Sequence, residues 1–459
     1  MNTRFDSIVI GTGQSGPALA TRLASAGRKV AIIERSRFGG TCVNTGCMPT
    51  KTLVASAYAA HLARRGAEYG VVLEGPVRVD MKRVKARKDE VAVRASQNVE
   101  KWLRGTANLT VIEGHGRLGA PGRVTVNGDT LEANQIFINV GARAMVPPIP
   151  GLESVDFLTN SSIMEVDFLP EHLVILGGSY IGLEFAQAYR RFGARVTVVE
   201  KFPQIIGRED AEVSQAVRDI LTLEGIAFET GVDRMSIEKR GAQVVVRLER
   251  AEGTREIVGS HLLVAVGRVP NTGDLGLADA GVKVDARGYI GVDDELRTNV
   301  PGIWAIGDCN GRGAFTHTSY NDYEIVADNL LNGDMRKVGD RLTAYALFVD
   351  PPLARVGLTD AEVRATGRKA LTARRPMTRV GRAIEKGETL GFMKITVDRE
   401  TKEILGAALL GVGADEAIHC ILDTMYARAP YTVLQRAVHI HPTLAELIPT
   451  LLGELAPMA

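Results

Sequence analysis

The sequence predicts an α/β fold made of two similar parallel-sheet units followed by a C-terminal α+β domain. Two segments carry the same order of features: a short apolar run, a glycine-rich turn, a helical stretch and a second apolar run that ends in an acid, Glu34 or Glu200. The region from residue 339 onward has strand and helix patterns but no such motif. Strands that alternate with helices in this way are typical of parallel sheets with crossover helices.

The first of these segments runs from Asp6 to Glu34 and contains the turn GTGQSG at residues 11–16. Its glycines permit a tight turn and a close approach of the backbone to a pyrophosphate. The N-terminus of the following helix faces the phosphate charge, and Glu34 can accept hydrogen bonds from ribose hydroxyls. The segment therefore predicts a Rossmann-like dinucleotide-binding domain.

The second segment repeats this pattern with the turn GGSYIG at residues 177–182. The spacing from its first glycine to Glu200 equals the corresponding spacing in the first segment. Ser179 replaces the middle glycine, and its hydroxyl can bond a phosphate directly. We expect a second Rossmann-like dinucleotide-binding domain here. The alternative is a strand, helix and strand that bind no nucleotide.

Two cysteines, Cys42 and Cys47, follow the first segment within the sequence GGTCVNTGCMPTK at residues 39–51. On a regular α-helix, residues i and i+5 have Cα atoms about 8.6 Å apart, whereas a disulfide tolerates less than about 7 Å. The helix start must therefore be distorted, and Gly46 and Pro49 permit that. A strained disulfide is typical of catalytic or regulatory chemistry. The alternative is two unrelated buried thiols.

The composition excludes several classes of partner. In 459 residues, 55 Lys and Arg nearly balance 54 Asp and Glu, so no strong field favours nucleic acid or an anionic membrane surface. No apolar stretch reaches the length of a membrane span. The 4 cysteines are too few for a structural disulfide framework. We expect a cytoplasmic protein that acts on small molecules, and no metal-ligand set is predicted.

Breaks in composition divide the chain into domains. The rigid sequence PPIPG at residues 147–151 marks the first break. An apolar segment at residues 296–308 later ends in Asp308, whose carboxylate can fix a sugar or ribitol hydroxyl. Helices are expected at residues 50–66 and 81–104. The predicted domains are 1–147 and 273–338 for the two parts of the first dinucleotide-binding domain, 148–272 for the second, and 339–459 for an interface domain.

Several side chains have a structural as well as a chemical interpretation. His441 and Glu446 lie near a helix start, where a glutamate suits the helix dipole. Cys309 and Cys420 are interpreted as packed thiols, because cysteine often fills buried space. His317 either reaches the edge of a bound cofactor or caps a helix.

Taken in order, these motifs resemble the pyridine nucleotide-disulfide oxidoreductases, a family that includes lipoamide dehydrogenase, glutathione reductase and mercuric reductase. The resemblance covers essentially the whole chain and includes VGRVPN at residues 266–271. Residues 45–53 and 315–320 look most similar to a mercuric-reductase-like branch that also contains a reactive-chlorine-responsive copper reductase. The chain departs from the family at Asn139, where alanine is usual. It also shows neither an N-terminal metal-binding module nor the C-terminal cysteine pair of mercuric reductases.

The resemblance implies FAD and a nicotinamide cofactor. NADH is expected, with NADPH as the alternative, because the Glu200 carboxylate accepts bonds from a ribose 2′-hydroxyl but repels a 2′-phosphate. Tyr180 resembles the aromatic residue that covers the flavin until the nicotinamide displaces it, and Lys51 with Glu184 resembles the ion pair beside flavin N5. The residues implied for FAD are Gly11, Gly13, Gly16, Glu34, Gly40, Thr41, Lys51, Gly116, Gly141, Asp308 and Thr316, and those implied for the nicotinamide cofactor are Gly177, Tyr180, Gly182, Glu200, Val232 and Gly267.

The same resemblance implies that electrons pass from NAD(P)H through the flavin and the Cys42–Cys47 disulfide to a disulfide-type acceptor. Cys47 is then the flavin-facing thiolate and Cys42 the interchange thiol. His441, oriented by Glu446, returns a proton to the departing thiol, since imidazole titrates near neutral pH. In the family this pair comes from the other subunit, which implies a homodimer. Two alternatives remain: a metal-ion reductase, and a redox sensor with slow turnover.

Overall fold

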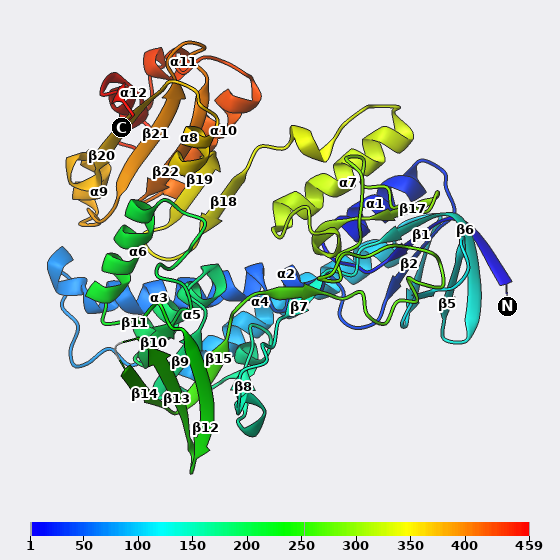
Figure 1. The fold of residues 1–459 in the computed structure, drawn as a ribbon, viewed down its shortest axis with the longest axis horizontal. Coiled ribbons are helices and arrows are strands. Elements are labelled where there is room, and N and C mark those ends of the chain that lie inside the picture. Colours follow the sequence, from blue (N-terminus) through cyan, green and yellow to red (C-terminus); the bar gives the residue numbers. More distant parts are fainter. Residues whose placement is uncertain (1, 252, 459) are drawn as a thin grey trace.

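The computed structural model describes residues 2–251 and 253–458, and it has the predicted α/β architecture. Figure 1 shows an N-terminal sheet unit in blue and cyan, a green sheet unit from the middle of the chain, and an orange-to-red C-terminal unit that lies beside the green unit at α6. None of the helices in the two described stretches is both long enough and apolar enough to cross a membrane.

The first sheet has seven strands in the order β3-β2-β1-β6-β5-β4, with β17 added beside β6. Strands β1, β2, β3, β6 and β17 run parallel, while β4 and β5 are antiparallel additions at one edge. Because β17 comes much later in the chain than β6, two separated pieces of sequence build this sheet. The strands are β1 (Asn2–Ile10), β2 (Val30–Glu34), β3 (Leu109–Glu113), β4 (Arg117–Leu118), β5 (Arg123–Val126), β6 (Asp129–Ile138) and β17 (Ile303–Ala305).

Helices cover this sheet and connect it to the rest of the chain. Helix α1 (Ser15–Ser25) packs against α7 (Thr316–Leu331), and α3 (Cys47–Arg64) packs against α4 (Met81–Arg104). The helix predicted at residues 81–104 has these bounds in the structure, whereas the helix predicted at 50–66 begins earlier, at Cys47. Helix α2 (Gly40–Asn44) precedes it as a separate short turn.

The second sheet is entirely parallel and has the strand order β11-β10-β9-β15-β8. A separate three-stranded antiparallel sheet, β12-β13-β14, packs beside it. Helix α5 (Tyr180–Phe192) follows β9 and contacts α3 of the first unit, and α6 (Ala211–Leu223) follows β10. The strands are β8 (Phe157–Leu158), β9 (His172–Leu176), β10 (Arg195–Val199), β11 (Ala227–Glu229), β12 (Arg234–Arg240), β13 (Gln243–Arg250), β14 (Gly253–Gly259) and β15 (His261–Val264).

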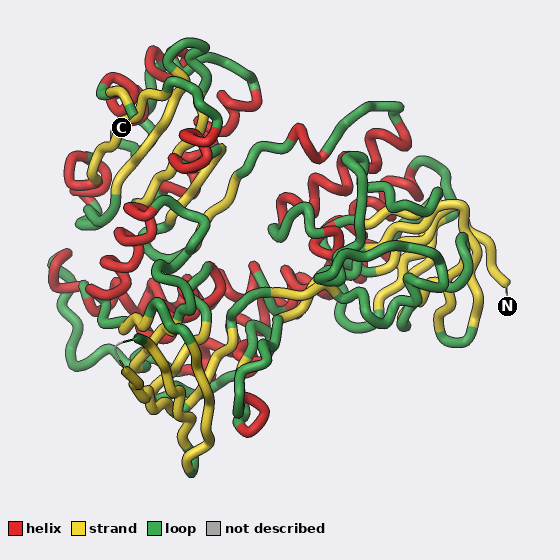
Figure 2. The backbone as a smooth tube through the Cα atoms, viewed as in Figure 1, coloured by secondary structure: helices red, strands yellow, loops and turns green. Residues whose placement is uncertain are grey.

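Two short antiparallel strands link the first two units. Strand β7 (Ala142–Ala144) pairs with β16 (Arg268–Pro270), with Val269 opposite Arg143. Figure 2 shows this pair as the yellow bridge between the two bodies. Strand β16 lies within the predicted VGRVPN segment, so that sequence forms the return from the second unit to the first.

The C-terminal unit is a six-stranded antiparallel sheet in the order β18-β19-β22-β21-β20-β23. Its apolar core lies between this sheet and helices α10 to α12. The elements are β18 (Ala344–Leu347), β19 (Leu353–Gly357), α8 (Asp360–Ala365), β20 (Ala370–Pro376), α9 (Gly381–Glu385), β21 (Phe392–Asp398), β22 (Ile404–Leu410), α10 (Ala414–Tyr426), α11 (Thr432–Arg436), α12 (Leu447–Gly453) and β23 (Ala456–Pro457).

The two glycine turns have nearly the same backbone geometry. Gly11 and Gly177 have φ of 106° and 107°, a region that favours glycine. A Cβ atom on Gly16 would lie 2.2 Å from the Gly11 carbonyl oxygen, and one on Gly182 would lie 2.1 Å from the Gly177 carbonyl oxygen. The last glycine of each turn therefore lets the helix pack directly on the end of the strand.

We expect Gly16→Ala to destabilise the protein by about 1 to 3 kcal/mol, the usual cost of overpacking a tight contact. The added methyl group meets backbone, which cannot rotate away. The midpoint of urea unfolding measures the effect. Gly273→Ala is the control, because a Cβ there meets nothing within 4 Å. Equal midpoints for the two variants would contradict this account of the turn.

Candidate functional site

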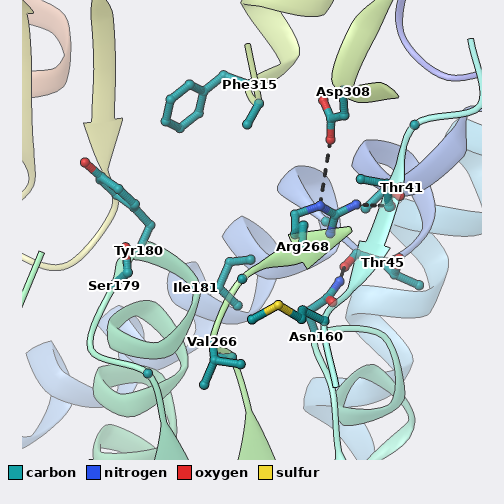
Figure 3. Close-up of a pocket in the computed structure, with 18 of the residues that line it drawn as sticks. Thr41, Thr45, Asn160, Ser179, Tyr180, Ile181, Val266, Arg268, Asp308 and Phe315 are labelled. Carbon is teal, nitrogen blue, oxygen red and sulfur yellow. Dashed lines mark hydrogen bonds and ion pairs between the residues drawn. The ribbon is translucent and has the colours of Figure 1, made fainter. Parts of the chain in front are cut away.

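One cavity of about 2490 Å³ extends from the first glycine turn past the second and reaches the C-terminal sheet. Figure 3 shows part of its lining, with the side chains of Tyr180 and Phe315 turned toward the same space. Most residues predicted from the sequence line this cavity: Gly11, Gly13, Glu34, Gly40, Thr41, Cys42, Cys47, Lys51, Gly116, Gly141, Gly177, Tyr180, Glu184, Glu200, Val232, Gly267, Asp308 and Thr316.

Four predicted residues lie outside the cavity lining. Gly16 and Gly182 sit behind their turns, where they allow helix and strand to touch. His441 and Glu446 lie in the C-terminal unit, away from this chain's own cavity. The resemblance to the family placed that pair in the partner's site.

The predicted distortion lies between the two cysteines. Helix α2 ends at Asn44 and α3 begins at Cys47, and Gly46 between them has φ of −126° and ψ of −121°. A Cβ on Gly46 would lie 2.8 Å from the Thr41 carbonyl oxygen, so this close return of the chain requires glycine. Cys42 and Cys47 are both free thiols in the structure.

The two thiols differ in charge. A hydrogen bond with Cys42, one with Thr316 and the nearby Lys51 ammonium lower the pKa of Cys47 from its ordinary 9.0 to about 6. The same hydrogen bond with Cys47, together with burial, raises the pKa of Cys42. Cys47 is also the first residue of α3, where the helix dipole favours a thiolate. At neutral pH the negative charge therefore rests on Cys47.

Thr316 touches both sulfur atoms. Its hydroxyl lies 3.0 Å from Cys47 Sγ and donates to Cys42 Sγ at 3.2 Å. Because a hydroxyl carries one proton and can rotate, it can donate to only one sulfur at a time. Thr316 is thus placed to serve whichever thiolate is present. Sequence comparison assigned this residue only to FAD binding.

Lys51 and Glu184 form the expected ion pair, with Nζ 2.5 Å from Oε2. The pair joins α3 of the first unit to α5 of the second. The other Glu184 oxygen accepts a hydrogen bond from the Phe348 backbone N–H at 3.0 Å, and the Lys51 ammonium lies 4.6 Å from the centre of the Phe348 ring. Two other parts of the chain, α5 and the segment at Phe348, therefore fix the lysine beside the thiols.

The two acids at the strand ends are held in the same way. Glu34 accepts a hydrogen bond from the Thr12 backbone N–H at 3.0 Å, and Glu200 accepts one from the Gly178 backbone N–H at 2.7 Å. Each carboxylate also accepts a bond from the backbone N–H two residues further along the chain. Both carboxylates therefore face the cavity directly above a glycine turn.

Asn139 is a site residue that the sequence analysis noted only as a departure from the family. Its side-chain amide donates to the carbonyl oxygens of Gly11 and Gly13, at 3.2 and 3.1 Å, and the residue is buried. These bonds fasten the first glycine turn to the end of β6. The alanine usual in the family offers no such donor. The asparagine at this position was therefore the sequence signal that could have identified it as a site residue.

Arg268 is a second residue missed from the sequence. Its Nε lies 3.7 Å from Oδ2 of Asp308, as Figure 3 shows, and both side chains line the cavity. Burial raises the pKa of Asp308, and the arginine opposes that shift. Nothing in the sequence relates these two positions, because β16 and the short helical turn Gly307–Asn310, which carries Asp308, come together only in the folded chain.

His441 and Glu446 form a pair at the surface of the C-terminal unit. Nδ1 of His441 lies 2.9 and 3.1 Å from the two carboxylate oxygens of Glu446. The imidazole is 79% exposed, whereas the Glu446 side chain is 16% exposed. Val438 and Ile440 beside it are exposed at 99% and 81%, which is unusual for apolar residues and typical of an interaction surface.

Cys309 and Cys420 are packed thiols, whereas His317 lines the cavity. Cys309 is fully buried, and burial raises its pKa to about 12. Cys420 is half-buried against the C-terminal core. The His317 ring stacks on Phe315 with ring centres 5.4 Å apart, and its Nε2 lies 2.8 Å from the Ala344 carbonyl oxygen.

The cavity fits two dinucleotides in its geometry and chemistry. Each glycine turn leads into a helix N-terminus, which favours phosphate, and each has a carboxylate above it for a ribose. The loop that follows β2 and contains Gly40 packs against the first glycine turn. A Cβ on Gly40 would lie 2.7 Å from Gly13 Cα. The two turns share one cavity with the thiol pair.

Comparison with known proteins gives a consistent result. Residues 5–322 match the model of the pyridine nucleotide-disulphide oxidoreductase family, and residues 343–452 match its dimerisation domain. The probable pyridine nucleotide-disulfide oxidoreductase RclA of Escherichia coli is 36% identical over 96% of this chain and 97% of its own. A mercuric reductase of Streptomyces lividans is 33% identical (97% and 95%), and a dihydrolipoyl dehydrogenase of Thermus scotoductus is 34% identical (96% and 95%).

A solved structure extends this similarity to three dimensions. The Cu(II) complex of the HOCl-induced flavoprotein disulfide reductase RclA from Escherichia coli superposes with a TM-score of 0.90. It covers 99% of each chain at 34% sequence identity.

We expect the FAD-bound, two-electron-reduced protein to show a long-wavelength absorption band from the Cys47 thiolate. The band should be constant above about pH 7 and disappear as the pH falls through about 6, because acid then protonates this thiolate. Thr316→Val should raise that midpoint by about one pH unit, the value of one hydrogen bond to a charged group. Absorbance recorded during a pH titration measures both effects.

Three variants serve as controls for this titration. Thr316→Ser keeps the hydroxyl and should leave the midpoint unchanged. Cys42→Ser should show the band without any reductant, and Cys47→Ser should lack it. A band that survives in Cys47→Ser would reverse the roles of the two thiols.

Proposed function

Because the chain belongs to the pyridine nucleotide-disulfide oxidoreductase family, whose members are NAD(P)H-dependent flavoprotein disulfide oxidoreductases, we propose that it reduces a small disulfide-type acceptor through Cys42 and Cys47. The observation that carries this proposal is the pair of unequal thiols, 3.0 and 3.2 Å from one hydroxyl, in the cavity that also contains both dinucleotide turns. A low-pKa thiolate beside a second thiol is the arrangement that thiol-disulfide exchange needs.

We propose that the first turn holds FAD and the second the nicotinamide cofactor. Glu34 and Asp308 would bind hydroxyl groups of FAD, and Glu200 would bind those of the adenosine ribose of the nicotinamide cofactor. Bound together, the two cofactors would supply a hydride and, from it, the electron pair that reduces the disulfide. The Lys51–Glu184 ion pair fixes a positive charge beside the thiols, and Tyr180 covers the nicotinamide side.

The residues of the chain then carry the electron pair to the acceptor. Cys42 loses its proton as it attacks one acceptor sulfur. A bond forms from Cys42 Sγ while the acceptor S–S bond breaks, and the first half of the acceptor leaves and is protonated. The Cys47 thiolate next attacks Cys42 Sγ, which restores the Cys42–Cys47 disulfide and releases the second half of the acceptor. Thr316 donates to the sulfur that bears the charge before each attack. Two electrons and two protons reach the acceptor.

The proton that Cys42 loses as it attacks, and the protons that the departing sulfurs take up, require a residue that can carry them. We propose that His441 of the partner subunit protonates the departing sulfur, held in place by the partner subunit's Glu446, in a homodimer. The exposed imidazole, its carboxylate and the exposed apolar residues beside it support this proposal, as does the match to a dimerisation domain at residues 343–452.

We also propose the domain division expected from the sequence. Residues 1–147 and 273–338 would form the FAD-binding domain, 148–272 the NAD(P)-binding domain and 339–459 the dimerisation domain. The pairing of β17 with β6 supports the two-part FAD domain, because it returns the chain to the first sheet.

A second candidate function is the reduction of metal ions. It is favoured by the likeness to a mercuric reductase and to the Cu(II) complex of RclA. The same two thiols would bind the ion and pass electrons to it, but no sulfur would leave and need a proton. The two functions therefore differ in their need for His441.

We expect His441→Ala to slow turnover with a disulfide acceptor by roughly 10²- to 10⁴-fold, the usual range for general acid-base catalysis. Reduction of the bound flavin by NADH should be nearly unchanged. Steady-state and stopped-flow absorbance measure the two rates. Turnover with Cu(II), if it occurs, should be scarcely affected, because electron delivery to the ion needs no proton at this position.

His439→Ala is the matched control for this experiment, since it removes a histidine two residues away. Mixing Cys42→Ala and His441→Ala protomers should restore up to about a quarter of normal disulfide reduction if the subunits exchange randomly. No recovery in exchanged dimers would place His441 in its own subunit's site. Efficient Cu(II) reduction that does not need His441, with slow disulfide reduction, would favour the metal-ion reductase.

We expect a higher kcat/KM for NADH than for NADPH. The Glu200 carboxylate lies over the second glycine turn, where it would repel a 2′-phosphate. Steady-state rates with the two cofactors measure the preference, and Glu200→Gln should reduce it by removing the charge while keeping the shape. A preference for NADPH in the unchanged protein would contradict the assignment.

A further inference from the structure

Three aromatic rings from three parts of the chain meet at one wall of the cavity. Tyr180 is the first residue of α5, Phe315 immediately precedes α7, and Tyr345 lies on β18. The Tyr180 ring meets Tyr345 edge-on with ring centres 5.6 Å apart, and it meets Phe315 edge-on at 6.0 Å. Phe315 and Tyr345 stack at 5.8 Å. The last two rings therefore form a corner in which Tyr180 rests.

A buried carboxylate anchors Tyr345. Its hydroxyl donates to Oε1 of Glu209 at 2.7 Å, and Arg355 Nε donates to Oε2 of the same carboxylate at 2.6 Å. Tyr345 and Arg355 are direct neighbours across the β18–β19 pair, so one sheet edge holds both oxygens of Glu209. Arg355 also donates to Asp210, at 2.9 Å.

This anchor is rigid because it excludes water. The side chains of Glu209 and Arg355 are 0% and 3% exposed. Burial and the Glu209 charge raise the pKa of Tyr345, so its hydroxyl remains a neutral donor. Glu209 belongs to the segment between β10 and α6, and the anchor therefore fixes the C-terminal sheet against the second dinucleotide unit.

Tyr180 itself is held by its ring contacts with Phe315 and Tyr345. It begins its helix, and Ser179 before it is exposed and extended, so the ring can leave the corner with little change in α5. One turn later the same helix carries Glu184, which is fixed by Lys51. The helix is therefore fixed while its first side chain depends on the contacts with Phe315 and Tyr345.

We propose that Tyr345 is a positioning residue that keeps Tyr180 over the nicotinamide seat and thereby sets the affinity for the nicotinamide cofactor. This inference rests on the proposed function, in which the nicotinamide displaces Tyr180. A cofactor that enters must separate Tyr180 from both rings of the corner, and each edge-on aromatic pair resists separation. The C-terminal sheet thus controls access to a site on another unit.

The dissociation constant of NAD⁺ for the FAD-bound protein, measured by calorimetry, tests the proposal. Tyr345→Leu should lower it about fivefold, the value of one edge-on aromatic pair. The KM for NADH should fall by a similar factor while kcat stays within about twofold. Tyr345→Phe keeps the ring but loses the anchor, and it should lower the dissociation constant about twofold. Tyr180→Ala should lower it at least as much as Tyr345→Leu.

The double variant distinguishes an effect through Tyr180 from any other. In the Tyr180→Ala background, Tyr345→Leu and Tyr345→Phe should cause no further change, since coupled residues are not additive. Tyr320→Leu is the matched control, because it removes an edge-on tyrosine pair, with Tyr323 at 4.9 Å, outside the cavity. It should leave the dissociation constant unchanged.

Three results would overturn the proposal in distinguishable ways. If Tyr180→Ala lowers the dissociation constant and neither Tyr345 variant does, Tyr180 covers the site without help from Tyr345. If Tyr180→Ala has no effect, the covering role of Tyr180 in the proposed function fails, and the role of Tyr345 fails with it. A Tyr345 effect that persists in the Tyr180→Ala background would likewise exclude a role through Tyr180. Tyr345→Phe keeps the test valid if Tyr345→Leu does not fold.

Discussion

The site depends on keeping a negative charge on Cys47 rather than on Cys42. The break at Gly46 makes this difference, because it places Cys47 at the first position of the long helix α3 and leaves Cys42 in the short turn before it. The helix dipole, the Thr316 hydroxyl and the Lys51 ammonium then all favour a thiolate at the same atom. A regular helix through both cysteines would remove the difference and separate the sulfurs.

Each source of this stabilisation comes from a different part of the fold. Thr316 arrives on α7, which follows the return of the chain to the first sheet through β17. Lys51 is fixed by Glu184 on α5 of the second unit, and Glu184 is fixed in turn by the Phe348 backbone of the C-terminal unit. The relative placement of the three units therefore determines the charge on one sulfur atom.

Much of this arrangement could be predicted from the sequence, because its main parts are local. A glycine turn, its helix and the acid at the end of the next strand lie within one short segment, and the cysteine break follows from the reach of a disulfide and a nearby glycine. Asn139, Arg268 and the Glu209–Arg355 pair could not be predicted in this way. Their partners lie far away in the chain, and only strand register or interunit packing brings them together. Gly16 and Gly182 were assigned to cofactor binding because they belong to the motif, but their nearest constraint is helix packing.

The C-terminal unit has two distinct duties if the proposed dimer forms. Within its own chain it holds Tyr345 against Tyr180 through a buried carboxylate and arginine, a pair whose desolvation cost is offset only while both partners are present. Across the dimer it would present His441 to the partner's thiols. One rigid sheet would then fix the entry of the reductant in one subunit and the exit of protons to the acceptor in the other. A shift of this sheet would alter both half-reactions at once, because the buried charges that anchor it, Glu209 and Arg355, join the second unit to the C-terminal unit.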